Sequence, residues 1–143
     1  MKKSLGLTES IGKTVEWILS AKHIVVFTGA GLSTASGLPD FRGPNGLWNQ
    51  PDKDQPSIDS ILPGKNLRPN DGHYAITELE KYGKVQFLIS QNIDGFHLDS
   101  GFPHDKLAEL HGNTNIVHCQ RCKEKYSKKE VEILIVCFAE LCR

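Results

Sequence analysis

The sequence predicts an α/β protein with a parallel sheet, and three observations lead to this class. Two short runs of β-branched and aromatic residues, HIVVFTG and KVQFLIS, have the length and composition of buried strands. A segment with helical spacing precedes each run, and a polar loop follows each run. A chain that repeats helix, strand and loop in this order is typical of a parallel sheet with flanking helices.

The first helix is expected over residues 8–21, with Thr8 as its N-cap. Its apolar residues recur at helical spacing, and they are Ile11, Val15, Ile18 and Leu19. A second helix is expected over residues 70–83, ending at Gly83. Its expected packing residues include Tyr74, Leu79 and Tyr82. Residues 50–69 are rich in Pro and Asp and predict an exposed connection, whereas QNIDGFHLDSG predicts a turn and a short helix.

The composition predicts a packed domain with no net charge. The 143 residues are 38% hydrophobic and 24% charged, and 17 basic side chains balance 17 acidic ones. This balance argues against a dedicated nucleic-acid binder, which usually has a strongly basic face. The longest apolar run is residues 133–139, far below the roughly 18 residues that span a bilayer. The first ten residues lack the apolar centre of a signal peptide, so we expect a cytoplasmic protein without a membrane partner.

A glycine-rich loop follows the first strand. Gly29, Ala30 and Gly31 would let the backbone approach a phosphate at the start of a helix formed by LSTAS. The dinucleotide pattern G-x-G-x-x-G fails at Thr34, so an ordinary strand–helix turn is an equal alternative. The neighbouring stretch GLPDFRGPNGLW favours a ligand site, because ordered loops of this length usually serve a ligand. It carries Asp40, Phe41, Arg42 and Trp48.

Polar side chains follow the second strand in SQNIDGFH. Ligands of open α/β sheets bind beyond the carboxyl ends of the strands, which is where Gln91, Asn92 and Asp94 are expected. The alternative is a hydrogen-bonded turn, because Asn and Asp cap turns routinely.

One histidine is a candidate general base. His111 lies next to a glycine after an apolar segment, and imidazole exchanges protons near neutral pH. The other five histidines are interpreted as structural: His23, His73, His97, His104 and His118.

All four cysteines lie in the last quarter of the chain, at Cys119, Cys122, Cys137 and Cys142. Clustered cysteines in an intracellular protein indicate metal or redox chemistry. The x2 spacing of CQRC fits one edge of a tetrahedral zinc site. The second pair is irregular and lies in the apolar stretch ILIVCFAELC, where Cys137 is equally well explained as a core residue.

The order of these motifs resembles the sirtuin family of NAD-dependent protein deacylases. TGAGLSTASGLPDFRGPNGLW, SQNIDGFH, LAELHGN and CQRC carry the resemblance, which covers residues 8 to about 126. STASGLPDFRGPNGLW and SGFPHDKLAELHGN are most similar to the branch that includes the nuclear human class IV members and their microbial relatives. The resemblance implies a partial Rossmann-like sheet with flanking helices over residues 1–114 and the start of a small zinc-binding module over residues 115–143.

The resemblance also implies a role for each motif residue. The matches to NAD-binding positions are Ala30, Gly31, Thr34, Phe41, Arg42 and Trp48, with Gly29 and Asp40 in the same loop. Gln91 matches a ribose contact, and Asn92 and Asp94 match residues that seat the nicotinamide end for cleavage. His111 matches the catalytic base. Cys119 and Cys122 match the first half of a structural zinc site, for which Cys137 and Cys142 are the candidates for the second half.

The implied reaction moves an acetyl group from an acyl-lysine protein or peptide to ADP-ribose and releases nicotinamide, with NAD consumed. Mono-ADP-ribosyl transfer is the alternative within enzymes. The non-enzymatic alternative is a catalytically inactive fragment that binds NAD or zinc. A zinc-ribbon module for nucleic acid would rest only on CQRC and KEKYSKK. Because sirtuins normally continue well beyond the zinc module, we expect this chain, which ends at Arg143, to be an N-terminal portion.

Overall fold

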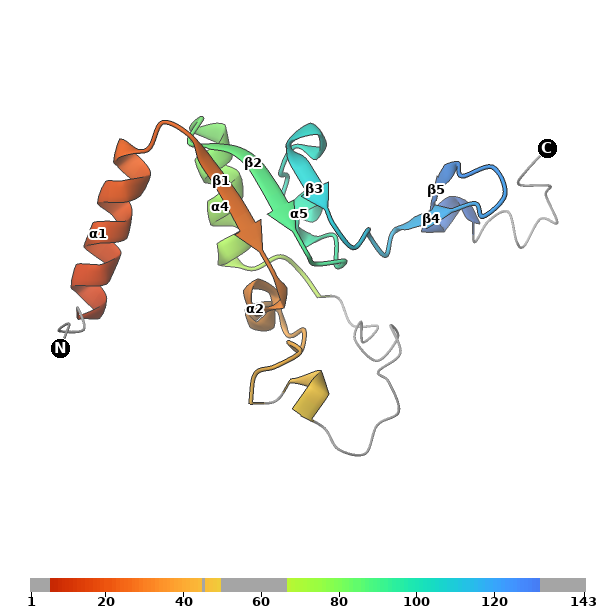
Figure 1. Ribbon diagram of the computed structural model, residues 1–143, viewed down its shortest axis with the longest axis horizontal. Coiled ribbons are helices and arrows are strands. Elements are labelled where there is room, and N and C mark those ends of the chain that lie inside the picture. The colour runs from red at the N-terminus through yellow and green to blue at the C-terminus, as the bar shows by residue number, and fades with distance from the viewer. Residues whose placement is uncertain (1–5, 45, 50–66, 132–143) are drawn as a thin grey trace.

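A computed structural model of the chain describes residues 6–44, 46–49 and 67–131. Its centre is a three-stranded parallel sheet in the order β1-β2-β3 (Figure 1). The strands are β1 (Ile24–Thr28), β2 (Val85–Ser90) and β3 (Leu107–Glu109). The two strands predicted from sequence are therefore confirmed, and β3 is an addition that the sequence did not predict.

The register of this sheet brings three strand ends together. Thr28 of β1 lies opposite Ser90 of β2, and Ser90 lies opposite Glu109 of β3. The loops that leave these residues therefore start side by side at one edge of the sheet. This is the edge where open parallel sheets bind ligands.

Helix α4 (Asp71–Lys81) packs on one face of the sheet and closes the core. Its N-cap is Asn70, whose side chain accepts from the Gly72 amide, while the His73 ring accepts from the Asn70 amide. Gly83 ends this helix with a φ of 71°, a left-handed conformation that favours glycine. The core consists of Val85, Leu88 and Phe102, with Ile24, Val26, Ile76, Leu79 and Leu107 packed against it.

Helix α1 (Leu7–Ser20) stands beside the sheet in Figure 1. Its N-cap is Gly6, without a side-chain hydrogen bond, so the expectation of a cap at Thr8 was wrong. Its apolar face stays largely exposed, since Ile11 and Leu19 are 55% and 65% exposed.

Several residues that the sequence placed in the core are exposed instead. On β1, Val25 and Phe27 are each 60% exposed, because no described element covers that face of the strand. Tyr74 of α4 and Tyr82, the C-cap of this helix, are 46% and 79% exposed, whereas Leu79 packs as expected.

Short elements make up the remainder of the described chain. They are α2 (Ala30–Ser33), η1 (Thr34–Ser36), η2 (Leu47–Asn49), α5 (Phe96–Asp99) and η3 (His104–Lys106). An antiparallel pair, β4 (Ile116–His118) and β5 (Lys125–Ser127), forms a second sheet apart from the first (Figure 1). No helix within the described residues is long and apolar enough to cross a bilayer.

Candidate active site

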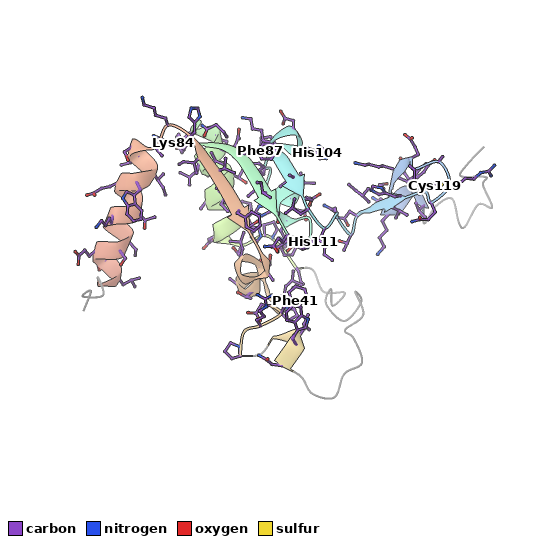
Figure 2. The ribbon with its side chains drawn as sticks, viewed as in Figure 1. Phe41, Lys84, Phe87, His104, His111 and Cys119 are labelled. Carbon is purple, nitrogen blue, oxygen red and sulfur yellow. The ribbon has the colours of Figure 1, made fainter. Side chains whose placement is uncertain are left out.

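Two adjoining cavities open where β1 and β2 end. Their volumes are about 270 Å³ and about 410 Å³. Both are lined by Ala30, Phe41, Gln91, Asn92 and His111. These residues come from the loops after β1 and β2 and from the turn after β3, so the sheet register brings them together. Figure 2 shows His111 between the sheet and the loop that carries Phe41.

The first wall is the turn that joins β1 to α2. Gly29 has an extended backbone, and its carbonyl accepts from the Leu32 amide at 3.0 Å. A Cβ at Gly31 would meet nothing within 4 Å, so space is open above this residue. The second cavity is lined by Gly29, Ala30 and Gly31 together, which leaves this stretch of backbone accessible to a ligand.

The second wall is the loop over residues 37–49, which its own hydrogen bonds hold in shape. The Asp40 carboxylate accepts from the Gly43 amide, and the Phe41 carbonyl accepts from the Trp48 amide, both at 3.0 Å. A Cβ at Gly46 would lie 2.7 Å from the Phe41 carbonyl group, so only glycine fits there. The Arg42 guanidinium lies 5.1 Å from the centre of the Trp48 ring. The loop thus presents Phe41, Arg42 and Trp48 to the cleft as an ordered group.

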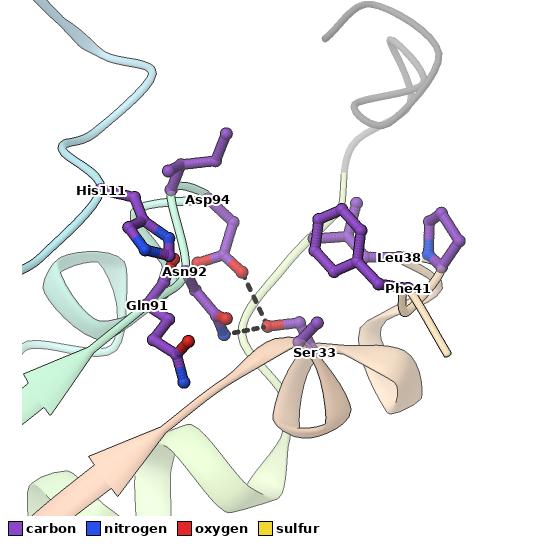
Figure 3. A pocket seen from close by; sticks show the side chains of 10 residues that line it. Ser33, Leu38, Phe41, Gln91, Asn92, Asp94 and His111 are labelled. Atoms are coloured by element: carbon purple, nitrogen blue, oxygen red, sulfur yellow. Dashed lines mark hydrogen bonds between the residues drawn. The ribbon is translucent and has the colours of Figure 1, made fainter. Parts of the chain in front are cut away.

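A network of polar side chains forms the floor (Figure 3). The Ser33 hydroxyl donates to Asp94 Oδ2 at 2.7 Å and accepts from Asn92 Nδ2 at 3.1 Å. Asn92 Nδ2 also donates to the Gly29 carbonyl at 3.1 Å. Both protons of this amide are then used inside the protein, so Asn92 offers a ligand its Oδ1, which is an acceptor. The floor therefore presents acceptor oxygens to the cavity.

Asp94 is oriented from two directions. Its Oδ1 accepts from the Phe96 amide at 3.0 Å, while Oδ2 accepts from Ser33. The turn chemistry expected for NIDG is thus present, and the same carboxylate also lines the first cavity. The turn interpretation is therefore confirmed for Asp94, and the ligand interpretation stays a prediction for the same residue.

The hydrogen bond of His111 decides which of its nitrogens can act as a base. Nδ1 lies 2.9 Å from the Gln91 carbonyl oxygen. A carbonyl can only accept, so in the neutral ring Nδ1 carries the proton and Nε2 has the lone pair. His111 lines both cavities. The site therefore combines a proton acceptor with a polar floor and an aromatic wall.

The comparison with known proteins decides the family. Residues 29–62 and 56–138 match the sequence profile of the Sir2 family. The chain belongs to the Sir2 family. The matched segments contain the glycine turn, the loop over residues 37–49, the polar floor and His111.

Named relatives agree with this assignment. The chain is 45% identical over 129 residues to the NAD-dependent protein deacetylase SRT1 of Oryza sativa subsp. indica, covering 90% of this chain and 27% of that protein. It is 42% identical over 120 residues to the NAD-dependent protein deacetylase Sirt6 of Drosophila melanogaster, covering 84% of this chain and 38% of that protein. A deacetylase of Oceanobacillus iheyensis matches at 43% identity over 133 residues, which is 80% of this chain and 55% of that protein. This chain thus spans between about a quarter and about half of these relatives.

Solved Sir2 structures share the fold. One, described as "Structural Basis for the Mechanism and Regulation of Sir2 Enzymes", superposes with a TM-score of 0.70 at 37% identity, covering 96% of this chain and 60% of that one. Another, described as "Sir2-p53 peptide-NAD+", gives a TM-score of 0.68 at 31% identity, covering 88% of this chain and 55% of that one. The α/β fold with a parallel sheet is therefore that of Sir2 proteins.

Most of the predicted site residues of this Sir2 chain meet in the cleft. The residues that line one or both cavities are Gly29, Ala30, Gly31, Asp40, Phe41, Arg42, Trp48, Gln91, Asn92, Asp94 and His111. Thr34 lines neither of them, because its hydroxyl turns back to the Gly31 carbonyl at 2.9 Å. Cys119 lies in the turn between β4 and β5, away from His111 (Figure 2), and Cys122 lies in the same turn. Cys137 and Cys142 lie outside the described residues.

Sequence reasoning missed Ser33, which is 2% exposed and connects Asn92 to Asp94. It also missed Leu38, Pro39 and Ile93, which line the first cavity. A small hydroxyl residue one turn after a strand-end glycine is a weak signal, and only the packing of α2 against the β2 loop shows its contact.

Proposed function

We propose that this Sir2 chain carries the catalytic cleft of an NAD-dependent protein lysine deacetylase, which moves acetyl from lysine to ADP-ribose and releases nicotinamide. The observation that carries the proposal is the His111 side chain, with its Nε2 lone pair, lining the same cavity as Asn92 and Asp94. NAD and a p53 peptide are named together for one similar solved structure, "Sir2-p53 peptide-NAD+". Binding of NAD and of an acyl-lysine peptide to this chain is part of the proposal.

The residues at the cleft fit NAD. The open space above Gly31 suits a phosphate group that approaches the backbone closely. The Arg42 guanidinium, held on Trp48, offers several donors to phosphate oxygens. We assign Gly29, Ala30, Gly31 and Arg42 to the diphosphate side, and Phe41, Trp48 and Gln91 to the ribose and nicotinamide side. Asp40 acts through the loop, because its carboxylate holds the Gly43 amide.

Bound NAD supplies the electrophile, which is the ribose carbon that carries nicotinamide. Asn92 Oδ1 and the Asp94 carboxylate accept hydrogen bonds and so orient an amide group at this end of the cleft. His111 Nε2 accepts a proton from a ribose hydroxyl. The Gln91 carbonyl, which accepts from Nδ1, holds the required tautomer and stabilises the ring once Nε2 is protonated.

We further propose that Cys119 and Cys122 are two ligands of a structural zinc ion. The Cys122 amide donates to Cys119 Sγ at 3.5 Å, a contact that favours a thiolate at that position. Within the described residues, no group of three or more metal-binding side chains occurs, so the remaining ligands would come from outside them. Cys137 and Cys142 are the proposed second pair. Zinc here would brace residues 115–143 as a separate module and take no part in the reaction.

Analysis of the products by mass tests the reaction type. The chain is incubated with NAD and an acetyl-lysine peptide, and peptide and nucleotide products are weighed. The proposal predicts a peptide lighter by one acetyl group and an ADP-ribose heavier by one. A peptide that gains ADP-ribose would instead establish mono-ADP-ribosyl transfer. NAD binding without any product would mean that the cleft binds but does not turn over in this chain.

A further inference from the structure

Two buried histidines lie beneath the floor of the cleft and have no part in the reaction proposed above. His73 of α4 is 0% exposed and His97 of α5 is 2% exposed. Their ring centres are 5.1 Å apart. Among the described residues, His73 Nε2 and His97 Nδ1 have no hydrogen-bond partner. Buried polar atoms of this kind are rare in folded proteins and require an explanation.

The hydrogen bonds of the other two ring nitrogens fix both tautomers. The Asn70 amide donates to His73 Nδ1 at 3.2 Å, so the proton of His73 sits on Nε2. The Thr28 hydroxyl donates to Ser90 Oγ at 3.0 Å and therefore accepts from His97 Nε2 at 2.9 Å. The proton of His97 thus also sits on Nε2, and its Nδ1 keeps a lone pair. The two atoms without a partner are therefore complementary: His73 Nε2–H is a donor and His97 Nδ1 is an acceptor.

The same series of bonds continues into the cleft. Ser90 Oγ also accepts from the backbone amide of Asn92 at 3.1 Å. Both lone pairs of Ser90 Oγ then accept a hydrogen bond, one from the Thr28 hydroxyl and one from the Asn92 amide. The Asn92 side chain in turn binds the Gly29 carbonyl and the Ser33 hydroxyl. A path of named hydrogen bonds therefore runs from His97 to the residue at the centre of the floor.

We propose that His73 and His97 are the buried end of one hydrogen-bonded chain, in which His73 Nε2–H donates to His97 Nδ1 and the chain positions Asn92 through Thr28 and Ser90. A ring spacing of 5.1 Å is one at which an imidazole N–H reaches a neighbouring imidazole nitrogen after a small rotation. His97 is a positioning residue: it acts on Asn92 through the hydroxyl groups of Thr28 and Ser90. The tautomers and the path of hydrogen bonds do not depend on the proposed function, whereas their effect on NAD binding rests on it.

Both rings must be neutral for this series of hydrogen bonds to form, because Nδ1 of a protonated His97 could no longer accept. Burial lowers the pKa of both histidines, and His73 lowers that of His97 further. Asp94 is the charged side chain whose field opposes this effect at both rings. Among the described residues, the other groups that hydrogen-bond to the two rings or pack on them edge-on are uncharged: the Thr28 hydroxyl, the Asn70 amide and the Phe96 ring.

Two matched substitutions test the path. Thr28→Val removes the hydroxyl between His97 and Ser90 and keeps the shape of the side chain. Thr77→Val is the control, since Thr77 is also buried, at 1% exposed, and its hydroxyl bonds only Ser100 among the described residues, at 2.9 Å. Thr28→Ser keeps the hydroxyl and serves as the rescue. The tautomers are read in the ¹⁵N-labelled full chain by long-range ¹H–¹⁵N spectra at pH 7, and amide exchange is measured at Asn92.

We expect both histidines as the Nε2–H tautomer in the unsubstituted chain. Amide exchange at Asn92, relative to global opening, should rise about fivefold to tenfold in Thr28→Val and stay unchanged in Thr77→Val and Thr28→Ser. The dissociation constant for NAD should rise by a similar factor in Thr28→Val only. A charged or Nδ1–H His97, or equal exchange in the two valine variants, would overturn the inference. If the unsubstituted chain binds no NAD, the proposed function fails, while the tautomers and exchange rates still decide this inference.

Discussion

A single hydroxyl group, that of Ser33, connects the two polar side chains on the floor of the cleft. This hydroxyl accepts a hydrogen bond from Asn92 and donates one to Asp94. The hydrogen bond to the Asp94 carboxylate is the shorter of the two, at 2.7 Å. Because Ser33 is 2% exposed, water cannot replace this hydroxyl without a rearrangement. At the residue scale, the site therefore depends on a side chain of the cavity lining whose hydroxyl is bound to two neighbouring side chains.

Replacing this hydroxyl should weaken both stability and binding. Ser33→Ala leaves Asn92 Nδ2 and Asp94 Oδ2 each without one partner, which costs about 1–3 kcal/mol for buried groups. We expect a lower melting temperature and weaker NAD binding, measured by thermal denaturation and calorimetric titration. Ser20→Ala, at an exposed serine on α1, is the control and should change neither. Unaltered NAD affinity in Ser33→Ala would mean that the floor network does not orient the ligand.

At the element scale, the loop over residues 37–49 is held in shape by hydrogen bonds between its own residues. Gly46 is its tightest point, because an added Cβ would lie 2.7 Å from the backbone of Phe41 and of Arg42. The ring of Phe41 and the pair formed by Arg42 and Trp48 depend on this close approach.

Gly46→Ala should therefore displace the loop without disturbing the sheet. We expect an NAD dissociation constant raised about tenfold or more, with the melting temperature lowered far less than by a core substitution. Gly12→Ala, in the open interior of α1, is the control and should slightly stabilise the helix with no effect on binding. Equal NAD affinity in Gly46→Ala and the parent chain would show that the loop shape is not needed.

The β4–β5 hairpin gives a second test at this scale. If Cys119 and Cys122 hold zinc, Cys119→Ser should release the metal and unfold the hairpin, because metal binding and folding are coupled in such modules. Zinc content is measured by elemental analysis and the hairpin by its amide spectrum. Gln120→Ala, at the exposed position between the two cysteines, should keep both. Full zinc content in Cys119→Ser would remove Cys119 from the ligand set.

The elements could be predicted well from the sequence, but their exposure could not. HIVVFTG and KVQFLIS have the β-branched composition of strands, and Gly83 has the positive φ that ends α4. Composition cannot tell which face of a strand is covered, so Val25 and Phe27 were assigned to the core although they are exposed. The strand β3 is only three residues long, and it forms because β2 offers it an edge rather than through its own propensity.

The candidate site could likewise be predicted only in part from the sequence. The loop residues and His111 are conspicuous in the sequence, because their types suit phosphate binding and proton transfer. Ser33 and the tautomer of His111 depend on contacts between segments about 20 to 61 residues apart, which no local pattern encodes.

At the scale of the whole molecule, the sheet is covered on one side by α4 and carries its ligand cleft at one edge. The division into residues 1–114 and 115–143 stays a prediction, to which the separate β4–β5 sheet lends support. Cytoplasmic location likewise stays a prediction from the sequence.

The buried histidines predict how the stability of the molecule depends on pH. Burial lowers the pKa of His97 to about 4 and also lowers that of His73, from an ordinary value of 6.5. Between pH 6.5 and 4 the unfolded chain binds protons that the folded chain refuses, so the free energy of unfolding should fall as the pH falls. Glu109 opposes this in part, because burial raises its pKa and acid then favours the folded state.

Denaturant unfolding at several pH values between 7.5 and 4 measures this dependence. His97→Gln removes one titrating ring, so its unfolding free energy should fall less steeply over the same range. A parent chain equally stable at pH 7 and pH 5 would contradict the neutral state of the two buried rings.

Nicotinamide release from NAD in the presence of an acetyl-lysine peptide tests the central claim most directly. The chain and its His111→Ala variant are compared at equal concentration, and NAD binding is measured for both. A base that acts in the chemistry predicts release by the parent chain, loss of turnover by at least about a hundredfold in the variant, and similar NAD affinity in both. Equal turnover in the two proteins would contradict the assignment of His111 as the base of this cleft.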